Sequence, residues 1–176
     1  FNLAIIQMNV TDSKQKNMEK AEKMLRQAAA DGADAAVLPE MFISPYSNEY
    51  WPEFAEPAGG PSVKRLSQLA SELKILLVAG TIPEVDDEGR LYNTSFCFSS
   101  GGELIGRHRK IHLFDINIKD GIQFKESDTL SAGEKATIIE TPWGKIGIAI
   151  CFDIRFAELF RFMAMRGAHT IIVPAA

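Results

Sequence analysis

The chain has 176 residues, of which 46% are hydrophobic and 24% are charged, and its formal net charge is −4. This composition predicts one globular domain with a sizeable core, and the acidic balance argues against nucleic acids and anionic membranes as partners. We expect no membrane-spanning segment and no signal peptide, because the apolar runs are only as long as strands, although the start at Phe1 leaves room for a short leader that has been removed.

Strands and helices alternate in the first half of the chain. The hydrophobic periodicity predicts these elements, in order: strand 2–10, helix 12–32, strand 34–40, helix 62–74 and strand 75–80. Asp12 is the predicted N-cap of the first helix, and Gly32 stands where a helix C-terminus favours a residue that can take positive φ.

Antiparallel pairs of strands are predicted in the second half. Residues 91–110 predict two strands around the turn sequence SSGG, and 138–150 predict a second hairpin. A helix is expected to begin near Asp153, and the chain ends in the apolar strand sequence TIIVPAA. Helical crossovers combined with hairpins predict an α/β fold with mixed sheets. Because the last strand is apolar enough to need neighbours, we interpret residues 1–176 as the front portion of a single, longer domain.

The chain contains two cysteines, Cys97 and Cys151. Secreted proteins that depend on disulfides have more cysteines in shorter chains, so a reducing, cytoplasmic compartment is predicted. Cys97 alternates with phenylalanines in a predicted strand, which indicates a packing role.

Three titratable residues stand at the ends of predicted strands: Glu40 follows AAVLP, Lys110 ends its strand and Cys151 follows KIGIAI. Ligands of open α/β sheets bind beyond the carboxyl ends of strands, so these side chains can converge. A thiol, a carboxylate and an ammonium supply the nucleophile, the proton carrier and the oxyanion stabiliser of acyl transfer. Taken singly, a small buried thiol, a solvated loop carboxylate and a surface lysine are the simpler interpretations. The predicted helix after Cys151 favours a catalytic interpretation of this residue, since a helix N-terminus stabilises a thiolate.

Three segments together resemble the signature segments of the nitrilase, or carbon–nitrogen hydrolase, superfamily: LPEMF at 38–42, RKIHLFD at 109–115 and ICFDIRFAEL at 150–159. The sequences SPY at 44–46 and FKES at 124–127 make the omega-amidase branch the most similar. The resemblance implies an αββα sandwich with mixed sheets, here lacking its C-terminal part.

The same resemblance implies the catalytic roles. Cys151 matches the nucleophile, Glu40 the general base and Lys110 the cation that holds the oxyanion. Glu126 matches a second glutamate that positions Lys110, and the backbone N–H of Phe152 matches a second oxyanion donor. No metal and no organic cofactor is expected.

The omega-amidase-like segments imply a small dicarboxylate monoamide as substrate, such as 2-oxoglutaramate or 2-oxosuccinamate. It would be cleaved to acid and ammonia through a thioester on Cys151. Arg155 is a candidate for binding the far carboxylate, because arginine binds carboxylates bidentately. An ion pair of Arg155 with a nearby Asp or Glu is an equally open alternative. Tyr46 is a candidate hydroxyl at the mouth of the pocket.

The predicted helix after Cys151 has two apolar faces. The face expected to pack on the core consists of Phe156, Leu159, Phe160 and Met163. Phe162 and Met165 lie on the other side, so this face is expected to be covered as well. Pairing across a helical layer, which the resemblance implies, predicts a homodimer or a higher homo-oligomer. The alternative is that the missing part of the same chain covers it.

Other activities remain open at this stage. Hydrolysis of a nitrile or of an N-carbamoyl amine is the main alternative within the superfamily. A redox thiol protein would need a resolving cysteine or a CxxC motif, and a non-catalytic scaffold would not need Glu40, Lys110 and Cys151 together. His108 and His112 are spaced like a metal pair on a helix, but their segment predicts strand and turn.

Overall fold

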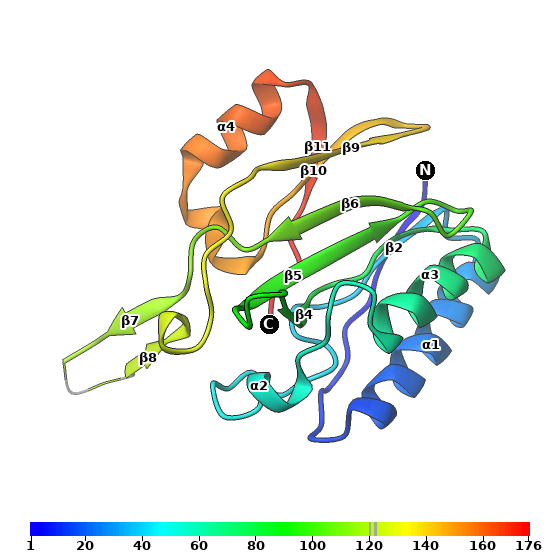
Figure 1. Cartoon of the computed structure of the whole chain (residues 1–176). Helices are drawn as coiled ribbons and strands as arrows, with labels where there is room; N and C mark the ends of the chain where they lie inside the picture. The colour runs from blue at the N-terminus through cyan, green and yellow to red at the C-terminus, as the bar shows by residue number, and fades with distance from the viewer. Residues whose placement is uncertain (120, 122) are drawn as a thin grey trace.

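Two β-sheets lie face to face in the computed structural model, and helices cover their outer faces (Figure 1). The structure describes residues 1–119, 121 and 123–176. The larger sheet consists of β1 (Leu3–Ile5), β2 (Ala35–Val37), β3 (Leu76–Val78), β4 (Ile82–Val85), β5 (Leu91–Phe98) and β6 (Leu104–Arg109). Strands β1, β2 and β3 are parallel, whereas β5 runs antiparallel to β3, β4 and β6.

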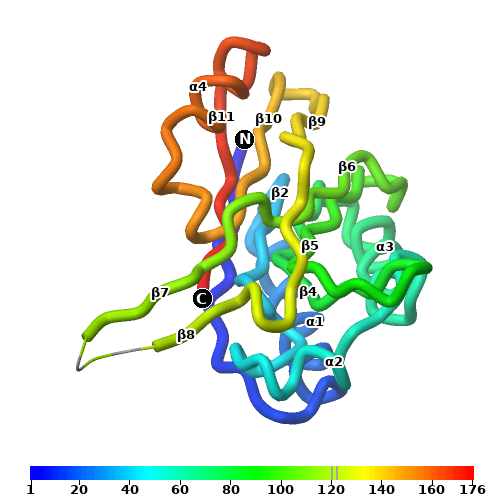
Figure 2. The backbone as a smooth tube through the Cα atoms, turned by 60° about the vertical axis from the view of Figure 1, so that its left-hand side comes forward, coloured from blue at the N-terminus to red at the C-terminus, as the bar shows by residue number. Residues whose placement is uncertain are grey.

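The smaller sheet is also mixed. It consists of β9 (Thr137–Thr141), β10 (Gly144–Ile148) and β11 (Ala168–Ile172). Strand β10 is antiparallel to β9 and parallel to β11. A separate antiparallel pair, β7 (Asp115–Asn117) and β8 (Gln123–Lys125), projects from the body of the molecule in both views of the backbone (Figures 1 and 2).

Four α-helices and two 3-10 turns are found in the described residues. They are α1 (Lys14–Ala30), α2 (Trp51–Phe54), α3 (Pro61–Leu73), α4 (Ala157–Met165), η1 (Glu126–Asp128) and η2 (Cys151–Arg155). Among these described residues, no helix is both long and apolar enough to cross a membrane.

Three apolar layers hold the sandwich together. Helices α1 and α3 pack on the larger sheet through residues such as Leu25, Leu66 and Phe96. Between the sheets, the buried side chains are Ala35, Val37, Leu76, Val78, Cys97, Ile139, Ile146, Ile148 and Ile172. Helix α4 covers the smaller sheet through Leu159 and Met163. This arrangement confirms the predicted αββα sandwich with mixed sheets, and it confirms the packing role of Cys97.

The predicted elements are largely present, with differences at their ends. Ser13, not Asp12, caps α1, since its side chain accepts a hydrogen bond from the N–H of Lys16. Gly32 has φ 84 and follows α1, as predicted. The first strand is much shorter than the predicted 2–10, because its partner β2 ends just before Pro39, which has no N–H to donate.

The helix expected near Asp153 begins later, at Ala157. A 3-10 turn, η2, occupies Cys151–Arg155, and the next residue, Phe156, has a φ of −111° and a ψ of 89° that interrupt the helical path. The nucleophile candidate Cys151 therefore stands at the start of this short turn rather than at the N-terminus of α4.

Candidate active site

The ends of β2 and β6 bring two predicted site residues into direct contact. Glu40 follows β2 after Leu38 and Pro39, and Lys110 directly follows β6. The Nζ atom of Lys110 lies 2.8 Å from Oε1 of Glu40, and both side chains are inaccessible to solvent. Because an unpaired buried charge is very costly, each group needs the other in its ionised form.

A second carboxylate lies on the other side of the ammonium group. Oε1 of Glu126, the first residue of η1, is 3.0 Å from Nζ of Lys110. Its other oxygen, Oε2, accepts a hydrogen bond of 2.6 Å from the N–H of Phe114. The hydroxyl of Tyr46 donates to Glu126 and accepts from Lys110 at 3.3 Å. Lys110 is thereby fixed between two glutamates and a tyrosine.

The charge states follow from this burial and pairing. Burial acts to lower the pKa of Lys110, but the charges of Glu40 and Glu126 outweigh it and the pKa is raised. Burial raises the pKa of Glu40, with Lys110 opposing the shift. Burial and the two nearby carboxylates also raise the pKa of Tyr46, so its hydroxyl stays protonated. The site thus contains a fixed cation and a carboxylate that is more basic than a free glutamate.

Cys151 completes the cluster from the smaller sheet. It follows β10, is partly exposed, and has φ 42, an uncommon backbone conformation for a residue other than glycine. Burial and the charge of Glu40 raise the pKa of Cys151 to about 11, with Lys110 opposing. The expectation that a helix N-terminus favours the thiolate is therefore wrong: α4 begins six residues later, and the negative charge of Glu40 disfavours a second anion.

The residues after β11 join the two halves of the cluster. The carbonyl of Pro174 accepts a hydrogen bond of 2.8 Å from the N–H of Cys151. Two residues later, the N–H of Ala176 donates to Oε2 of Glu40 at 3.1 Å. The segment 174–176 thus contacts both Cys151 and Glu40, and it fixes the position of the thiol relative to the carboxylate.

Sequence reasoning missed Asn93, which lies in the middle of β5. Its Nδ2 donates to Oε1 of Glu40 at 2.8 Å, and the residue is completely buried. Its backbone also accepts a hydrogen bond of 2.8 Å from the N–H of Lys110. The signal available in the sequence was the polar triplet Asn93, Thr94 and Ser95 inside an otherwise apolar strand.

The fold, the buried pair of Glu40 and Lys110, and the partly exposed Cys151 agree with what the chain matches among known proteins. The sequence model of the family described as carbon-nitrogen hydrolase matches residues 2–176. The chain belongs to the carbon–nitrogen hydrolase family.

Among curated members of this family, the chain is similar to omega-amidases. It is 46% identical over 176 residues to omega-amidase NIT2 of Xenopus tropicalis, covering 100% of this chain and 63% of that protein. It is 50% identical over 182 residues to the chloroplastic omega-amidase of Arabidopsis thaliana, covering 100% of this chain and 49% of that protein. The chain therefore spans only part of the length of these relatives.

Solved structures of the nitrilase superfamily have the same fold. Saccharomyces cerevisiae Nit3, a member of branch 10 of the nitrilase superfamily, matches with a TM-score of 0.88 and 39% identity, over 99% of this chain and 64% of that chain. The NitFhit protein of C. elegans matches with a TM-score of 0.88 and 28% identity, over 99% of this chain and 43% of that chain. These similarities confirm the resemblance to the nitrilase superfamily and to its omega-amidase branch.

In this carbon–nitrogen hydrolase chain, Asp153 fixes the turn that carries the thiol. Its completely buried carboxylate accepts hydrogen bonds from the N–H of Ile150 at 2.9 Å and from the N–H of His112 at 2.9 Å. The ring nitrogens of His112 and His108 lie 2.7 Å and 3.4 Å from the same carboxylate. These bonds lower the pKa of Asp153 against the opposing effect of burial. The two histidines thus anchor η2, and the side chain of Asp153 caps this turn.

Three predicted residues remain: Phe152 and Arg155, which lie in η2, and Tyr46, which contacts Lys110. Phe152 is the second residue of η2, where backbone N–H groups have no partner within the turn. Arg155 ends η2 and is exposed, and it forms no ion pair within the described part of the chain. Tyr46 does not stand apart at a pocket mouth: its hydroxyl contacts Glu126 and Lys110. A function of these residues in substrate binding remains a prediction.

Proposed function

We propose that the protein containing this chain hydrolyses a small linear amide to a carboxylic acid and ammonia, with Cys151 as nucleophile. The observation that carries the proposal is the buried Lys110 ammonium between Glu40 and Glu126, at 2.8 Å and 3.0 Å, next to the turn that begins with Cys151. This cluster supplies a base in Glu40, a cation in Lys110 and a thiol in Cys151, and the proposed reaction uses no further group. The activity is a proposal because the chain spans only 63% and 49% of the two omega-amidases described above.

In the first step, Glu40 accepts the thiol proton while the sulfur of Cys151 forms a bond to the amide carbon. A thiol with a pKa of about 11 is protonated at neutral pH, so the base has to act during the attack. The raised pKa of Glu40 suits it to this transfer. Negative charge then develops on the amide oxygen.

Lys110 becomes available to that oxygen through the same proton transfer. Its ammonium has three N–H donors, and the acceptors around it are Glu40, Glu126 and the Tyr46 hydroxyl. When Glu40 becomes neutral, its hold on Lys110 weakens, and the developing oxyanion replaces it as the negative partner. The N–H of Phe152 is proposed as the second donor. A fixed donor of this kind contributes about 3–4 kcal/mol in comparable oxyanion holes.

The remaining steps return the enzyme to its starting state. Glu40 gives its proton to the amide nitrogen, the C–N bond breaks, and ammonia leaves a thioester on Cys151. Glu40 then accepts a proton from water, whose oxygen attacks the thioester carbon. The C–S bond breaks, Glu40 returns its proton to the sulfur of Cys151, and the acid is released.

The substrate proposed is a dicarboxylate monoamide such as 2-oxoglutaramate or 2-oxosuccinamate, because the chain is similar to proteins named omega-amidase. Nitriles and N-carbamoyl amines are the alternatives. The test is ammonia release by the full-length protein from matched amides, nitriles and N-carbamoyl amines, with Cys151→Ala as control. A preference for nitriles or N-carbamoyl amines would contradict the omega-amidase assignment, whereas equal release by Cys151→Ala would contradict the thioester mechanism.

We further propose that two copies associate through α4 and that the protein is cytoplasmic. Leu159 and Met163 face the core, while Phe162 and Met165 are 44% and 76% exposed on the other side of the helix. Phe160, which was expected to face the core, is partly buried and packs against the buried cluster that contains Leu159 and Met163, whereas Phe156 is partly buried and precedes the helix. An apolar outer face on a short helix supports a homodimer. The cytoplasmic location rests on the presence of two free cysteines.

A further inference from the structure

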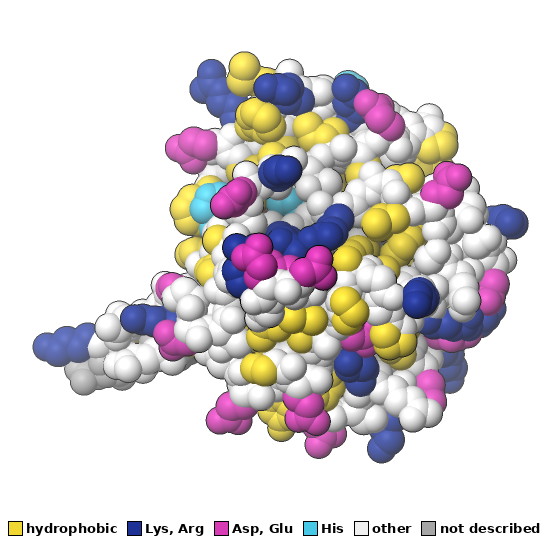
Figure 3. All heavy atoms as spheres, in the orientation of Figure 1, with side chains coloured by type: hydrophobic (Ala, Val, Ile, Leu, Met, Phe, Trp, Pro, Cys, Tyr) yellow, Lys and Arg dark blue, Asp and Glu magenta, His cyan; other side chains and the backbone are white. Residues whose placement is uncertain are grey.

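A cavity of about 480 Å³ lies on the face of β5 and β6 opposite to the catalytic cluster. Its lining comes from these strands and from the segment before β9: Arg90, Tyr92, Arg107, Arg109, Ala132, Gly133, Glu134 and Lys135. Lys and Arg side chains gather at the centre of the face shown in Figure 3, with Asp and Glu side chains directly beside them. None of these residues takes part in the proposed reaction.

The alternation of side chains along the strands separates this cavity from the active site. Arg109 and Lys110 are neighbours in sequence, as are Tyr92 and Asn93, and successive side chains of a strand point to opposite faces. Lys110 and Asn93 contact Glu40, whereas Arg109 and Tyr92 line the cavity. A ligand in the cavity therefore has no direct contact with Glu40.

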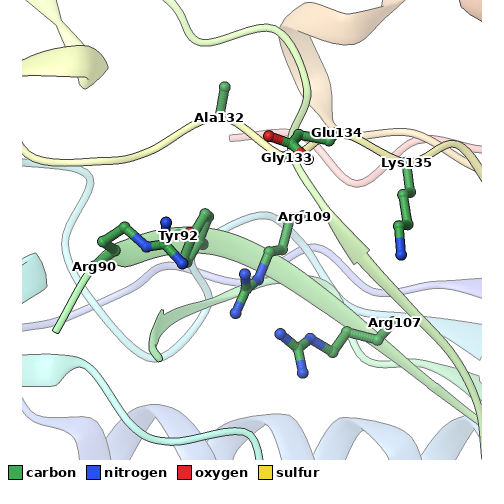
Figure 4. A pocket seen from close by; sticks show the side chains of 8 residues that line it. All are labelled: Arg90, Tyr92, Arg107, Arg109, Ala132, Gly133, Glu134 and Lys135. Atoms are coloured by element: carbon green, nitrogen blue, oxygen red, sulfur yellow. The ribbon is translucent and has the colours of Figure 1, made fainter. Parts of the chain in front are cut away.

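The side chains that line the cavity are mostly cationic, and acidic residues beside the lining pair with three of them: Glu84 with Arg107 and Arg109, and Asp86 and Glu88 with Arg90. Four lining residues are cationic, namely Arg90, Arg107, Arg109 and Lys135, and one, Glu134, is acidic. Figure 4 shows Arg107 and Arg109 extending from the strands and Lys135 extending from the opposite segment, around the same space. Such a concentration of cations in a concave site attracts anions.

Buried partners hold the two central arginines in place. The carboxylate of Glu84 is 1% exposed, and its Oε1 lies 2.8 Å from Arg107 and 2.7 Å from Arg109. The guanidinium of Arg109 also lies over the ring of Tyr92, 3.6 Å from its centroid. A guanidinium has five N–H donors, so these contacts leave further donors for a ligand. Fixed guanidinium groups lose little freedom when they bind an anion.

The opposite wall is attached to β6 by its backbone. The N–H of Gly133 donates to the carbonyl of Lys110 at 2.7 Å. A side chain at Gly133 would place its Cβ only 2.2 Å from the carbonyl oxygen of Arg109, so glycine permits this close approach. Because Glu134 and Lys135 follow directly, they are held across the cavity from the arginines.

We propose that this cavity binds a small multivalent anion through carboxylate or phosphate oxygens. Arg107, Arg109 and Lys135 supply the main contacts, and the volume lies in the range of small-molecule sites. Carboxylates and phosphates share the bidentate oxygen geometry that arginine recognises. The proposal does not depend on the proposed amidase activity, since the two sites lie on opposite faces of the sheet.

The test is calorimetric titration of the full-length protein with citrate and, separately, with pyrophosphate, at low and at physiological salt. Arg107→Ala and Lys135→Ala are each expected to weaken binding about tenfold, the loss of one charge-assisted hydrogen bond. Glu134→Gln is expected to tighten it, because a repelling carboxylate is removed. Lys23→Ala removes an exposed charge on α1, outside the cavity, and is expected to leave the dissociation constant unchanged.

The three substitutions of lining residues, with Lys23→Ala as the control outside the cavity, give distinguishable outcomes. Binding of either anion that weakens in Arg107→Ala and Lys135→Ala supports the site, and the tighter anion identifies carboxylate or phosphate as the natural chemistry. No binding of either at millimolar concentration, or binding that none of the three variants alters, would overturn the proposal. Since Glu134→Gln should improve binding, loss of folding cannot imitate the expected pattern.

Discussion

Asn93 and Lys110 donate hydrogen bonds to the same oxygen of Glu40, each at 2.8 Å. One donor is neutral and the other is a cation, and all three side chains are completely buried. The amide of Asn93 therefore orients the carboxylate and stabilises its ionised form. Asn93 is a positioning residue for the proposed base.

Replacing Asn93 with Ala is expected to lower kcat/KM about 10- to 100-fold, since a hydrogen bond to a charged group contributes about 1.5–3 kcal/mol. Loss of this donor also raises the pKa of Glu40 further. Glu40 has to be ionised to accept the thiol proton, so the acid limb of the pH profile of kcat/KM is expected to move to higher pH. The measurement is that profile for amide hydrolysis.

The control for Asn93 is Ser95→Ala, on the same face of β5 two residues further along and also completely buried. Its activity and its acid limb are expected to stay at the wild-type values. An unshifted acid limb in Asn93→Ala would mean that Asn93 only supports the fold.

Removal of the negative charge of Glu40 is expected to make Cys151 more acidic. Burial and Glu40 together raise the pKa of Cys151 to about 11, so Glu40→Gln should lower this value and increase the thiolate fraction at pH 8. We expect faster alkylation of Cys151 by iodoacetamide, together with loss of amide hydrolysis. The measurement is the alkylation rate, with the modified residue located by mass spectrometry.

The second cysteine serves as an internal control in that experiment. Cys97 is completely buried, and burial raises its pKa to about 12, so it should stay unmodified in the folded protein. Slower alkylation of Cys151 in Glu40→Gln would contradict the expected electrostatic effect and indicate that Glu40 acts as a base even towards iodoacetamide.

Sequence patterns predicted the part of the site that lies at strand ends. Glu40, Lys110 and Cys151 follow strands, and the edge of a sheet brings such positions together whatever the loop lengths between them. Asn93 lies inside a strand, and which face it points to depends on the register of β5 with its neighbours. The hydrophobic pattern did not determine that register, because both faces of β5 are buried.

The turn at Cys151 illustrates a tertiary contact that overrides local preference. The sequence from 152 to 167 predicts one helix, but the Asp153 side chain bonds to the N–H of Ile150, to His108 in β6 and to His112 just after β6. The two histidines lie 45 and 41 residues before Asp153, so no local pattern contains them. Similarly, Glu126 was identified only through the family resemblance, since its contacts with Lys110 and Phe114 depend on the path of the chain between β6 and β9.

Arg155→Ala is expected to raise the KM for 2-oxosuccinamate about tenfold and to leave an uncharged amide of equal length unaffected. Arg155 is exposed at the end of η2, four residues after Cys151, and has no ion pair with any residue described in the structure, so the alternative of an intramolecular salt bridge has no support. Loss of one charge-assisted contact accounts for the magnitude. Steady-state kinetics on both amides measures it.

Two further results complete the test of Arg155. Arg155→Lys keeps the charge but not the bidentate geometry, and is expected to restore part of the affinity. If the wild type hydrolyses both amides equally well, the protein does not select a carboxylate. If selectivity survives Arg155→Ala, another residue binds the carboxylate.

Met165→Glu is expected to convert a dimer of the full-length protein to monomers. Met165 is 76% exposed on the outer side of α4, beside Phe162, so a charge there would be buried without a partner in the proposed interface. Sedimentation velocity at micromolar concentration measures the change. The matched control is Leu104→Glu, which introduces the same charge at a residue that is 52% exposed at the start of β6. This variant is expected to stay dimeric, because β6 lies on the other sheet from the one that α4 covers. A wild-type monomer would contradict association through α4, as would a Met165→Glu dimer of unchanged stability.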